Sequence, residues 1–505
     1  MSIPLPFRTR SPAAAVDHQA ATARRAFFGT IALSVVNSGR LVLQVLVIPV
    51  LGRILGPSAF GLVALATPFI LFANMLADAG MGNALIREQN PSREMESTVF
   101  WMSFGVGLSL ALLLCAGSPL IAAIVHQPAL TPILMGLAPI LVFSSTLSVA
   151  NARISRARHF GMFAVGDLLS MVLSSVAAIA AAINGWGAWS LVLQQVVLWV
   201  AKAGWVLTAA RFRPAFVCRP SLARDLLRFG LHNVGADIAA LIGRNAPALV
   251  IGATLGVVAV GHYSMAYNLV RIPDLVLSGP LYLATFTAVS AVAAAKGGAA
   301  PMCLRTLRMV STVMAPLFCG LALVSDLVIQ AYLGPKWHGT AAELAILSVA
   351  GFFLCQYALM GAVLMGLGRS DLQFRLSLLG AGGMVVGAVV GQHFGLSAAA
   401  AGVSAGAAVV FPFYFATVAR QLNIGVGTTL ANIGRPLIAT AVMALAVLAI
   451  RHEVSAANPW AELVACIAVG VVTFTVTLAA TSGRQILDDV RMILPARRPA
   501  SPEVT

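Results

Sequence analysis

Charged residues are scarce in this 505-residue sequence: Asp, Glu, Lys and Arg make up only 10% of it, whereas 59% of its residues are apolar. Acidic residues are the fewest, with 17 against 32 Lys and Arg, which gives a net charge of +15. Together with a mean hydropathy of +0.92, so little charge excludes a soluble globular chain. The sequence therefore predicts a membrane protein.

The sequence also lacks the motifs that usually indicate a catalytic or metal site. The six cysteines are scattered without a C-x-x-C spacing, so we interpret them as small apolar residues rather than as a metal or disulfide framework. No Walker A motif is present, which argues against direct use of ATP. A membrane polymerase, ligase or glycosyltransferase needs acid and base groups converging in a substantial loop, and the loops here are short and poor in carboxylates. We therefore expect no enzyme activity, no cofactor and no metal site.

Apolar runs of about 20 residues, the length that a helix needs to cross a bilayer, follow one another along the chain. Fourteen such runs lie near residues 27–51, 58–78, 98–116, 130–150, 161–183, 187–209, 229–252, 262–286, 309–332, 341–367, 372–391, 396–418, 436–450 and 460–481. The predicted fold class is an all-α, polytopic membrane protein with about 14 transmembrane helices.

Basic residues concentrate in alternate connections between these runs. If the N-terminus is cytoplasmic, 25 of the 32 basic residues lie in cytoplasmic segments, and only Arg53, Lys336 and Arg451 lie in outer ones. Cytoplasmic loops of membrane proteins carry such an excess of Lys and Arg. The distribution predicts that both termini are cytoplasmic, and it explains the net charge without a nucleic-acid partner.

One short motif occurs twice, 200 residues apart. Residues 50–66 and 250–266 are identical at seven of 17 positions, and each copy lies between two apolar runs. We interpret each copy as a tight turn between two helices, in which glycine permits positive φ and close helix approach. Six helices, an even number, separate the copies, so the two halves are predicted to be parallel repeats.

The duplication and the charge pattern together predict the organisation of the chain. The predicted parts are a cytoplasmic tail (1–26), an N-lobe with six spans (27–210), a cytoplasmic linker (211–228), a C-lobe with six spans (229–420), two further spans (421–482) and a cytoplasmic C-terminal tail (483–505). Both duplicated turns lie on the predicted outer side. Either they meet there as a periplasmic gate, or they only close two separate hairpins.

Polar residues inside apolar runs are costly in lipid and are the first functional candidates. On three runs they share helical stripes, and the candidates for lining a cavity are Asn37, Arg40, Gln44, Asp237, Arg244, Tyr267, Arg271 and Asp274. They would form a water-filled, mainly cationic cavity for an anionic substrate, or they would only hold helices together. Arg271 and Asp274, three residues apart, have the spacing to pair with each other. Asp167 and Lys202 lie near helix ends, where we interpret them as reaching to the membrane interface.

A family resemblance rests on the first copy of the motif. GRILGPSAFG (52–61), followed by DAGMGNALIR (78–87), resembles the opening of the bacterial polysaccharide-transporter (Wzx-type flippase) family. That family belongs to the superfamily of multidrug and oligosaccharidyl-lipid exporters. The resemblance implies alternating access in the bacterial inner membrane. It also implies transfer of undecaprenyl-diphosphate-linked oligosaccharides to the periplasmic leaflet for exopolysaccharide, capsule or O-antigen synthesis.

The resemblance also suggests partners: membrane lipid, H⁺ or Na⁺ as a coupling ion, and the polysaccharide polymerase and chain-length machinery. Two other functions are compatible with the same fold. A multidrug/cation antiporter would favour an anionic, aromatic cavity, whereas the excess here is basic. A peptidoglycan lipid-precursor flippase also uses arginines, but the opening motif argues against it.

Overall fold

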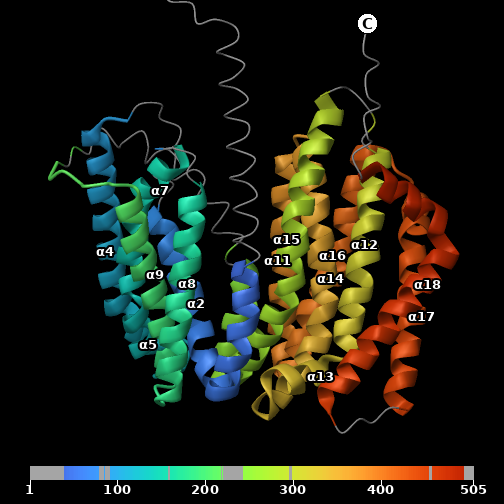
Figure 1. The fold of residues 1–505 in the computed structure, drawn as a ribbon, viewed down its shortest axis with the longest axis horizontal. Coiled ribbons are helices and arrows are strands. Elements are labelled where there is room, and N and C mark those ends of the chain that lie inside the picture. The colour runs from blue at the N-terminus through green and yellow to red at the C-terminus, as the bar shows by residue number, and fades with distance from the viewer. Residues whose placement is uncertain are drawn as a thin grey trace, which may run out of the picture. The chain divides into compact units, whose positions relative to one another are not determined.

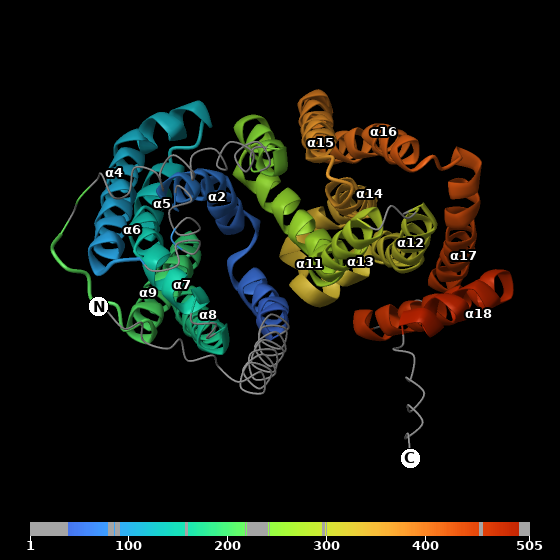
Figure 2. The same cartoon turned by 90° about the horizontal axis from the view of Figure 1, so that it is seen from above.

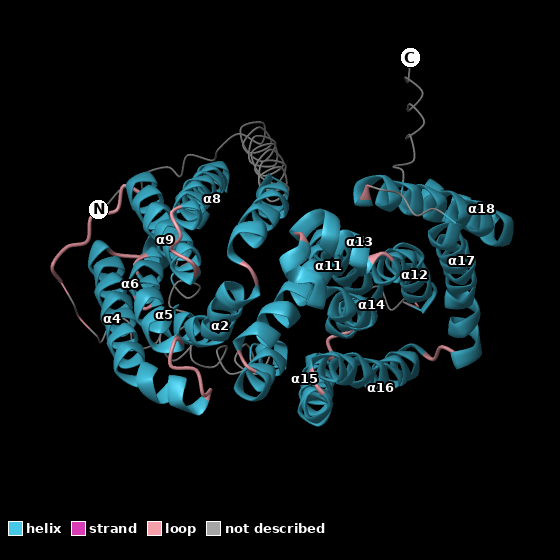
Figure 3. Ribbon diagram, turned by 90° about the horizontal axis from the view of Figure 1, so that it is seen from below, coloured by secondary structure: helices cyan, strands magenta, loops and turns pink. Residues whose placement is uncertain are grey.

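The computed structural model describes residues 39–78, 85, 91–156, 160–217, 219, 241, 243–294, 298, 300–453 and 458–493. These residues are almost entirely helical, joined by short turns, and contain no strand (Figures 1 and 3). The all-helical fold class predicted from the apolar runs is therefore confirmed for the described part of the chain.

Eleven helices in the described residues are long and apolar enough to cross a membrane, or twelve with the bent helix of residues 257–293. Two of the fourteen predicted spans, 27–51 and 229–252, lie partly outside the described residues, so the count of fourteen stays a prediction. The predicted span 309–332 needs correction: its helix runs from Ala300 to Leu323 and is followed by short helical pieces.

The structure divides into two compact units, which are described separately. The first contains the described residues of 1–54, 69–122 and 128–238. Its helices are residues 39–54, the end of α2 (Pro57–Asp78), α4 (Arg93–Ile124), α5 (Leu130–Leu137), α6 (Pro139–Ser145), α7 (Leu147–Arg156), α8 (Phe160–Ile183) and α9 (Ala188–Ala209). Helix α9 packs against α5, α6, α7 and α8. The α5–α6 break falls at Pro139, which has no N–H for the preceding turn.

The second unit contains residues 55–68 and 123–127 and the described residues after 238. Its helices are the start of α2, residues 243–255, α11 (Val257–Ala294), α12 (Ala300–Leu323), α13 (Ser325–Val328), η1 (Ile329–Leu333), η2 (Pro335–Thr340), α14 (Ala341–Gly366), α15 (Ser370–Gly391), η3 (Gln392–Phe394), α16 (Leu396–Leu422), α17 (Val426–Glu453) and α18 (Pro459–Ile493). Helix α14 is central, because it packs against α11, α12 and α16 (Figure 2).

Small residues set the distance between α15 and α16. Gly387 lies against the backbone of Gly402, and Gly383 lies against the backbone of Gly406. A Cβ at Gly387, Gly402 or Gly406 would overlap the opposite backbone, and a Cβ at Gly383 would overlap the Val410 side chain. Close contact of this kind is how membrane helices associate when lipid removes the hydrophobic drive between them.

The two copies of the repeated motif adopt the same conformation. A helix ends at residue 55 and another at residue 255, and each is followed by a glycine with positive φ, +79° at Gly56 and +85° at Gly256. A new helix then begins at once, α2 in the first copy and α11 in the second. Only glycine adopts such a backbone readily, so the predicted turns between two helices are confirmed.

The starts of α2 and α11 also touch each other within the second unit. Gly61 lies against the carbonyl of Val257, and Gly261 lies against the carbonyl of Pro57. Because equivalent positions differ by 200, the contact is symmetric. The duplicated turns therefore meet, and their role as a periplasmic gate stays a prediction.

An aromatic side chain covers this contact. Trp337 of η2 is fully buried and packs edge-on against Phe60 of α2, with ring centroids 5.4 Å apart, and against His262 of α11, at 6.0 Å. Nδ1 of His262 lies 2.7 Å from the Thr340 hydroxyl. The meeting point of the repeated turns is thus closed by η2.

Candidate functional site

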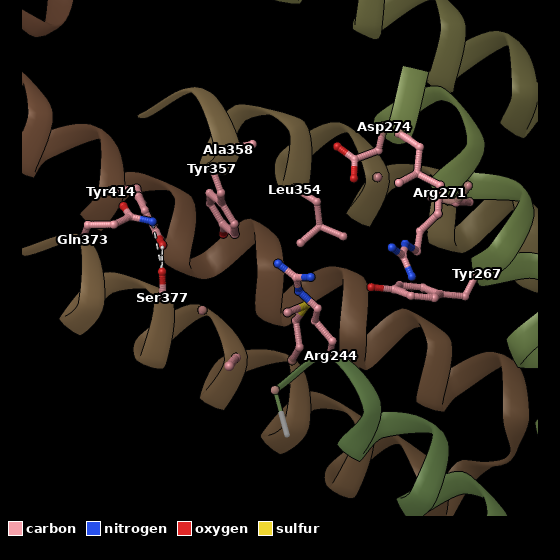
Figure 4. A pocket seen from close by; sticks show the side chains of 17 residues that line it. Arg244, Tyr267, Arg271, Asp274, Leu354, Tyr357, Ala358, Gln373, Ser377 and Tyr414 are labelled. Atoms are coloured by element: carbon pink, nitrogen blue, oxygen red, sulfur yellow. Dashed lines mark hydrogen bonds between the residues drawn. The ribbon is translucent and has the colours of Figure 1, made fainter. Parts of the chain in front are cut away.

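A cavity of about 340 Å³ lies inside the second unit, between α11, α14, α15, α16 and the helix of residues 243–255. Figure 4 shows its two ends: Tyr267, Arg271 and Asp274 at one, and Gln373, Ser377 and Tyr414 at the other, with Arg244 in between. The volume falls near the lower limit of the range for small-molecule sites.

The charged end is built mainly by one face of α11. Tyr267, Arg271 and Asp274 follow one another at spacings of four and three residues, which places them on one helical stripe. No ion pair joins Arg271 to Asp274; instead the Asp274 carboxylate accepts the S–H of Cys355, with 3.5 Å between sulfur and oxygen. The alternative that these two residues simply pair with each other is therefore wrong.

The other end of the cavity is polar but uncharged. Gln373 donates to the Ser377 hydroxyl (3.1 Å), which lies 3.3 Å from the hydroxyl of Tyr414. Tyr414 stacks on Tyr357 at a centroid distance of 4.4 Å, and the Tyr357 hydroxyl donates to the carbonyl of Ala407. Helices α14, α15 and α16 thus bring together side chains from distant parts of the sequence.

The first unit contains a different charge cluster. The Asp167 carboxylate of α8 binds Arg40 through one oxygen (2.9 Å) and Lys202 of α9 through the other (2.6 Å). Asp167 is only 12% exposed, and Lys202 also packs over the rings of Phe163 and Trp199. Asp167 and Lys202 thus belong to a three-helix ion-pair network, and their predicted position at the membrane interface stays a prediction.

The structure separates the predicted site residues into groups. Arg244, Tyr267, Arg271 and Asp274 line one cavity. Arg40 lies in the first unit with Gln44 one turn along the same helix. Asn37 and Asp237 lie outside the described residues, so their roles stay predictions.

Sequence reasoning missed the uncharged end of the cavity. Gln373 and Ser377 carry a detectable signal, because they are polar and four residues apart in an apolar run. Tyr357 and Tyr414 carry none, since an aromatic residue in an apolar run is usually part of a core.

Comparison with known proteins gives the context for these sites. The model of a family described as polysaccharide biosynthesis protein matches residues 50–342, more than half of the chain. The chain belongs to this family. The resemblance carried by residues 52–61 is thereby confirmed.

Two relatives are similar over most of the length. The succinoglycan biosynthesis transport protein ExoT of Rhizobium meliloti is 27% identical over 473 residues, covering 92% of this chain and 95% of that protein. The lipopolysaccharide biosynthesis protein WzxC of Escherichia coli is 24% identical over 369 residues, covering 71% and 72%.

Solved structures show the same fold at low identity. The lipid II flippase MurJ in an inward closed conformation matches with a TM-score of 0.73 at 12% identity, covering 90% of this chain and all of that one. An inward-facing multidrug resistance transporter of the MATE family matches with a TM-score of 0.58 at 18% identity, covering 76% and 94%. This polysaccharide biosynthesis protein is therefore a multi-pass membrane transporter of a bacterial transporter family, not an enzyme.

Proposed function

We propose that this protein moves undecaprenyl-diphosphate-linked oligosaccharide units across the bacterial inner membrane, from the cytoplasmic to the periplasmic leaflet. The translocated oligosaccharide units would be used for the synthesis of an exopolysaccharide, a capsule or an O-antigen. The observation that carries the proposal is the cavity of the second unit, where Arg244 and Arg271 come from different helices and form no ion pair with a described residue.

Two such arginines suit a diphosphate. The guanidinium group presents several N–H donors in a fixed fork that matches phosphate oxygens. A charge held inside a membrane protein without a partner is costly, so an anionic cargo would stabilise the cavity. The names of the relatives, one for succinoglycan transport and one for lipopolysaccharide synthesis, support a cargo of this class.

The charge balance argues against the antiporter alternative. Among the described side chains that line the cavity, Arg244 and Arg271 outnumber the one carboxylate, Asp274. A site for a cationic drug needs the opposite excess, since like charges repel the ligand. The fold shared with multidrug transporters therefore does not imply that this protein carries a cationic drug.

The repeated turns supply a closure for alternating access. On the predicted topology, the contact between Gly61, Gly261 and their opposite carbonyls lies at the periplasmic end. Closure there leaves the cytoplasmic side for cargo entry, and separation of α2 from α11 would release the cargo outward. Coupling to H⁺ or Na⁺, and contacts with the polymerase and chain-length machinery, stay predictions of the family resemblance.

Transport by the purified protein tests the proposal. The full chain is reconstituted in liposomes with a fluorescent undecaprenyl-diphosphate disaccharide, and dithionite quenching from outside measures how fast the inner pool reaches the outer leaflet. We expect the wild type to equilibrate the two pools and Arg244→Ala to fail. Arg420→Ala, on the exposed end of α16 and outside the cavity, is the matched control. Wild-type liposomes that quench no faster than empty ones would overturn the proposal.

A further inference from the structure

The uncharged end of the cavity has hydrogen-bonding capacity that the protein does not use. Oε1 of Gln373 is buried without a partner among the described residues. Ser377 and Tyr414 have two hydroxyl protons but only one oxygen–oxygen contact between them, so one proton remains to be donated. The cluster therefore offers one acceptor and one donor.

An uncharged donor and acceptor side by side complement a group that both donates and accepts. A sugar hydroxyl is such a group, whereas a phosphate only accepts, and a metal ion or an ammonium group only needs acceptors. An unpaired buried amide oxygen costs free energy, so a cargo hydroxyl that reaches it stabilises the complex.

Position links this cluster to the arginines. Arg244 lies between the two ends of the cavity (Figure 4), so an anionic group bound there has the charged end on one side and the cluster on the other. In a sugar diphosphate, the sugar is attached directly to the terminal phosphate. The cavity thus has the same order of chemical groups as the head of such a lipid.

We infer that Gln373, Ser377 and Tyr414 form a subsite for a neutral sugar residue of the cargo, next to the arginines that bind its diphosphate; this rests on the proposed function. The amide of Gln373 lies over Gly361 of α14, where an added Cβ would come within 2.7 Å of Nε2. Gly361 therefore leaves the room in which the amide, whose terminal torsion is soft, turns toward a ligand.

Binding of four matched probes tests the subsite. One probe is farnesyl diphosphate capped by a methyl group, and the others carry glucose, galactose or N-acetylglucosamine in place of the methyl, so that all have the same charge. Dissociation constants are measured for the full chain in lipid nanodiscs. We expect the wild type to bind at least one sugar probe about tenfold more tightly than the methyl probe, the size expected for two net hydrogen bonds.

Substitutions in the cluster remove this preference and leave the rest of the binding intact. In Gln373→Leu and in Tyr414→Phe the preference falls below about threefold, while affinity for the methyl probe stays within about twofold, because each change removes a neutral hydrogen bond. Gln392→Leu, a glutamine of η3 outside the cavity, is the control and keeps the preference. Gly361→Ala moves the Gln373 amide and also lowers the preference, although alanine favours the helix.

The outcomes are separable. A wild type that binds all four probes equally overturns the subsite, and so do cluster variants that weaken the methyl and sugar probes by the same factor. A wild type that binds none of the probes, or an Arg244→Ala variant that binds the methyl probe normally, instead contradicts the proposed function.

Discussion

The two units each contain a cluster of charged side chains, and the clusters differ in whether their members already have partners. In the first unit, one carboxylate, Asp167, joins Arg40 and Lys202 at 2.9 and 2.6 Å. In the second unit, Arg244, Arg271 and Asp274 share a cavity, yet none of them forms an ion pair with a described residue. Both groups look alike in the sequence, as polar residues within apolar runs.

This difference teaches which charges stabilise the fold and which await a ligand. When each oxygen of a buried carboxylate contacts a cation, these contacts offset the free-energy cost of removing the carboxylate from water. Removing the carboxylate then leaves the two cations without a counter-ion. An arginine that lines a cavity without a partner contributes little to the fold and is available to an anion. The first cluster is therefore expected to affect stability, and the second to affect transport.

The largest effect tests the cavity. In the double variant Arg244→Ala with Arg271→Ala, we expect the transport rate to fall about 100-fold or more, because each lost charge-assisted hydrogen-bonding group is worth roughly 1.5–3 kcal/mol. The liposome assay measures the rate, and thermal unfolding measures stability. Near-normal transport, or a large fall in the melting temperature, would contradict the assignment of the first cluster to stability and the second to transport.

Access to the cavity is tested at the repeated turns. Gly61→Val and Gly261→Val place side-chain atoms where the opposite backbone lies, and overpacking of this kind costs about 1–3 kcal/mol. We expect the closure to loosen and the transport rate to fall about tenfold. Gly105→Val on α4 is the control, since nothing lies within 4 Å of an added Cβ there. Equal effects of all three variants would show that the contact has no role in closure.

Asp167 tests the paired cluster. Asp167→Asn leaves Lys202 and Arg40 without their carboxylate, and we expect a loss of about 2 kcal/mol of stability, reduced from the value for fully buried pairs because Arg40 is 53% exposed. Transport per folded molecule should change by less than about threefold, since Asp167 is assigned no cargo contact. Adding Lys202→Met should recover part of the stability, because it removes an unpaired charge. Lost transport with unchanged stability would reverse the roles of the two clusters.

The smallest effect concerns Asp274, the one carboxylate among the described residues that line the cavity. Asp274→Asn removes repulsion of an anionic cargo, so the methyl-capped diphosphate probe should bind about two- to fivefold more tightly. Weaker binding in the nanodisc measurement would show instead that Asp274 orients Arg271 for the cargo.

Local pattern alone determined much of the architecture. The lengths of the apolar runs predicted most of the helices, because crossing a bilayer fixes a minimum length. The glycines of the repeated motif predicted the turns at residues 56 and 256, because positive φ depends on a single residue. The spacing of Tyr267, Arg271 and Asp274 predicted one shared face of α11, because 3.6 residues per turn is a local rule.

Tertiary structure decided what each face meets. Asp167 lies 127 residues from Arg40, and no local rule says that α8 brings its carboxylate to that helix. Gln373 and Tyr414 likewise belong to one cluster only because α15 packs against α16 through glycines at touching distance. Helical periodicity gives the direction of a side chain along its own helix. Whether that side chain finds a counter-ion, a neutral partner or an open cavity depends on which helices pack together.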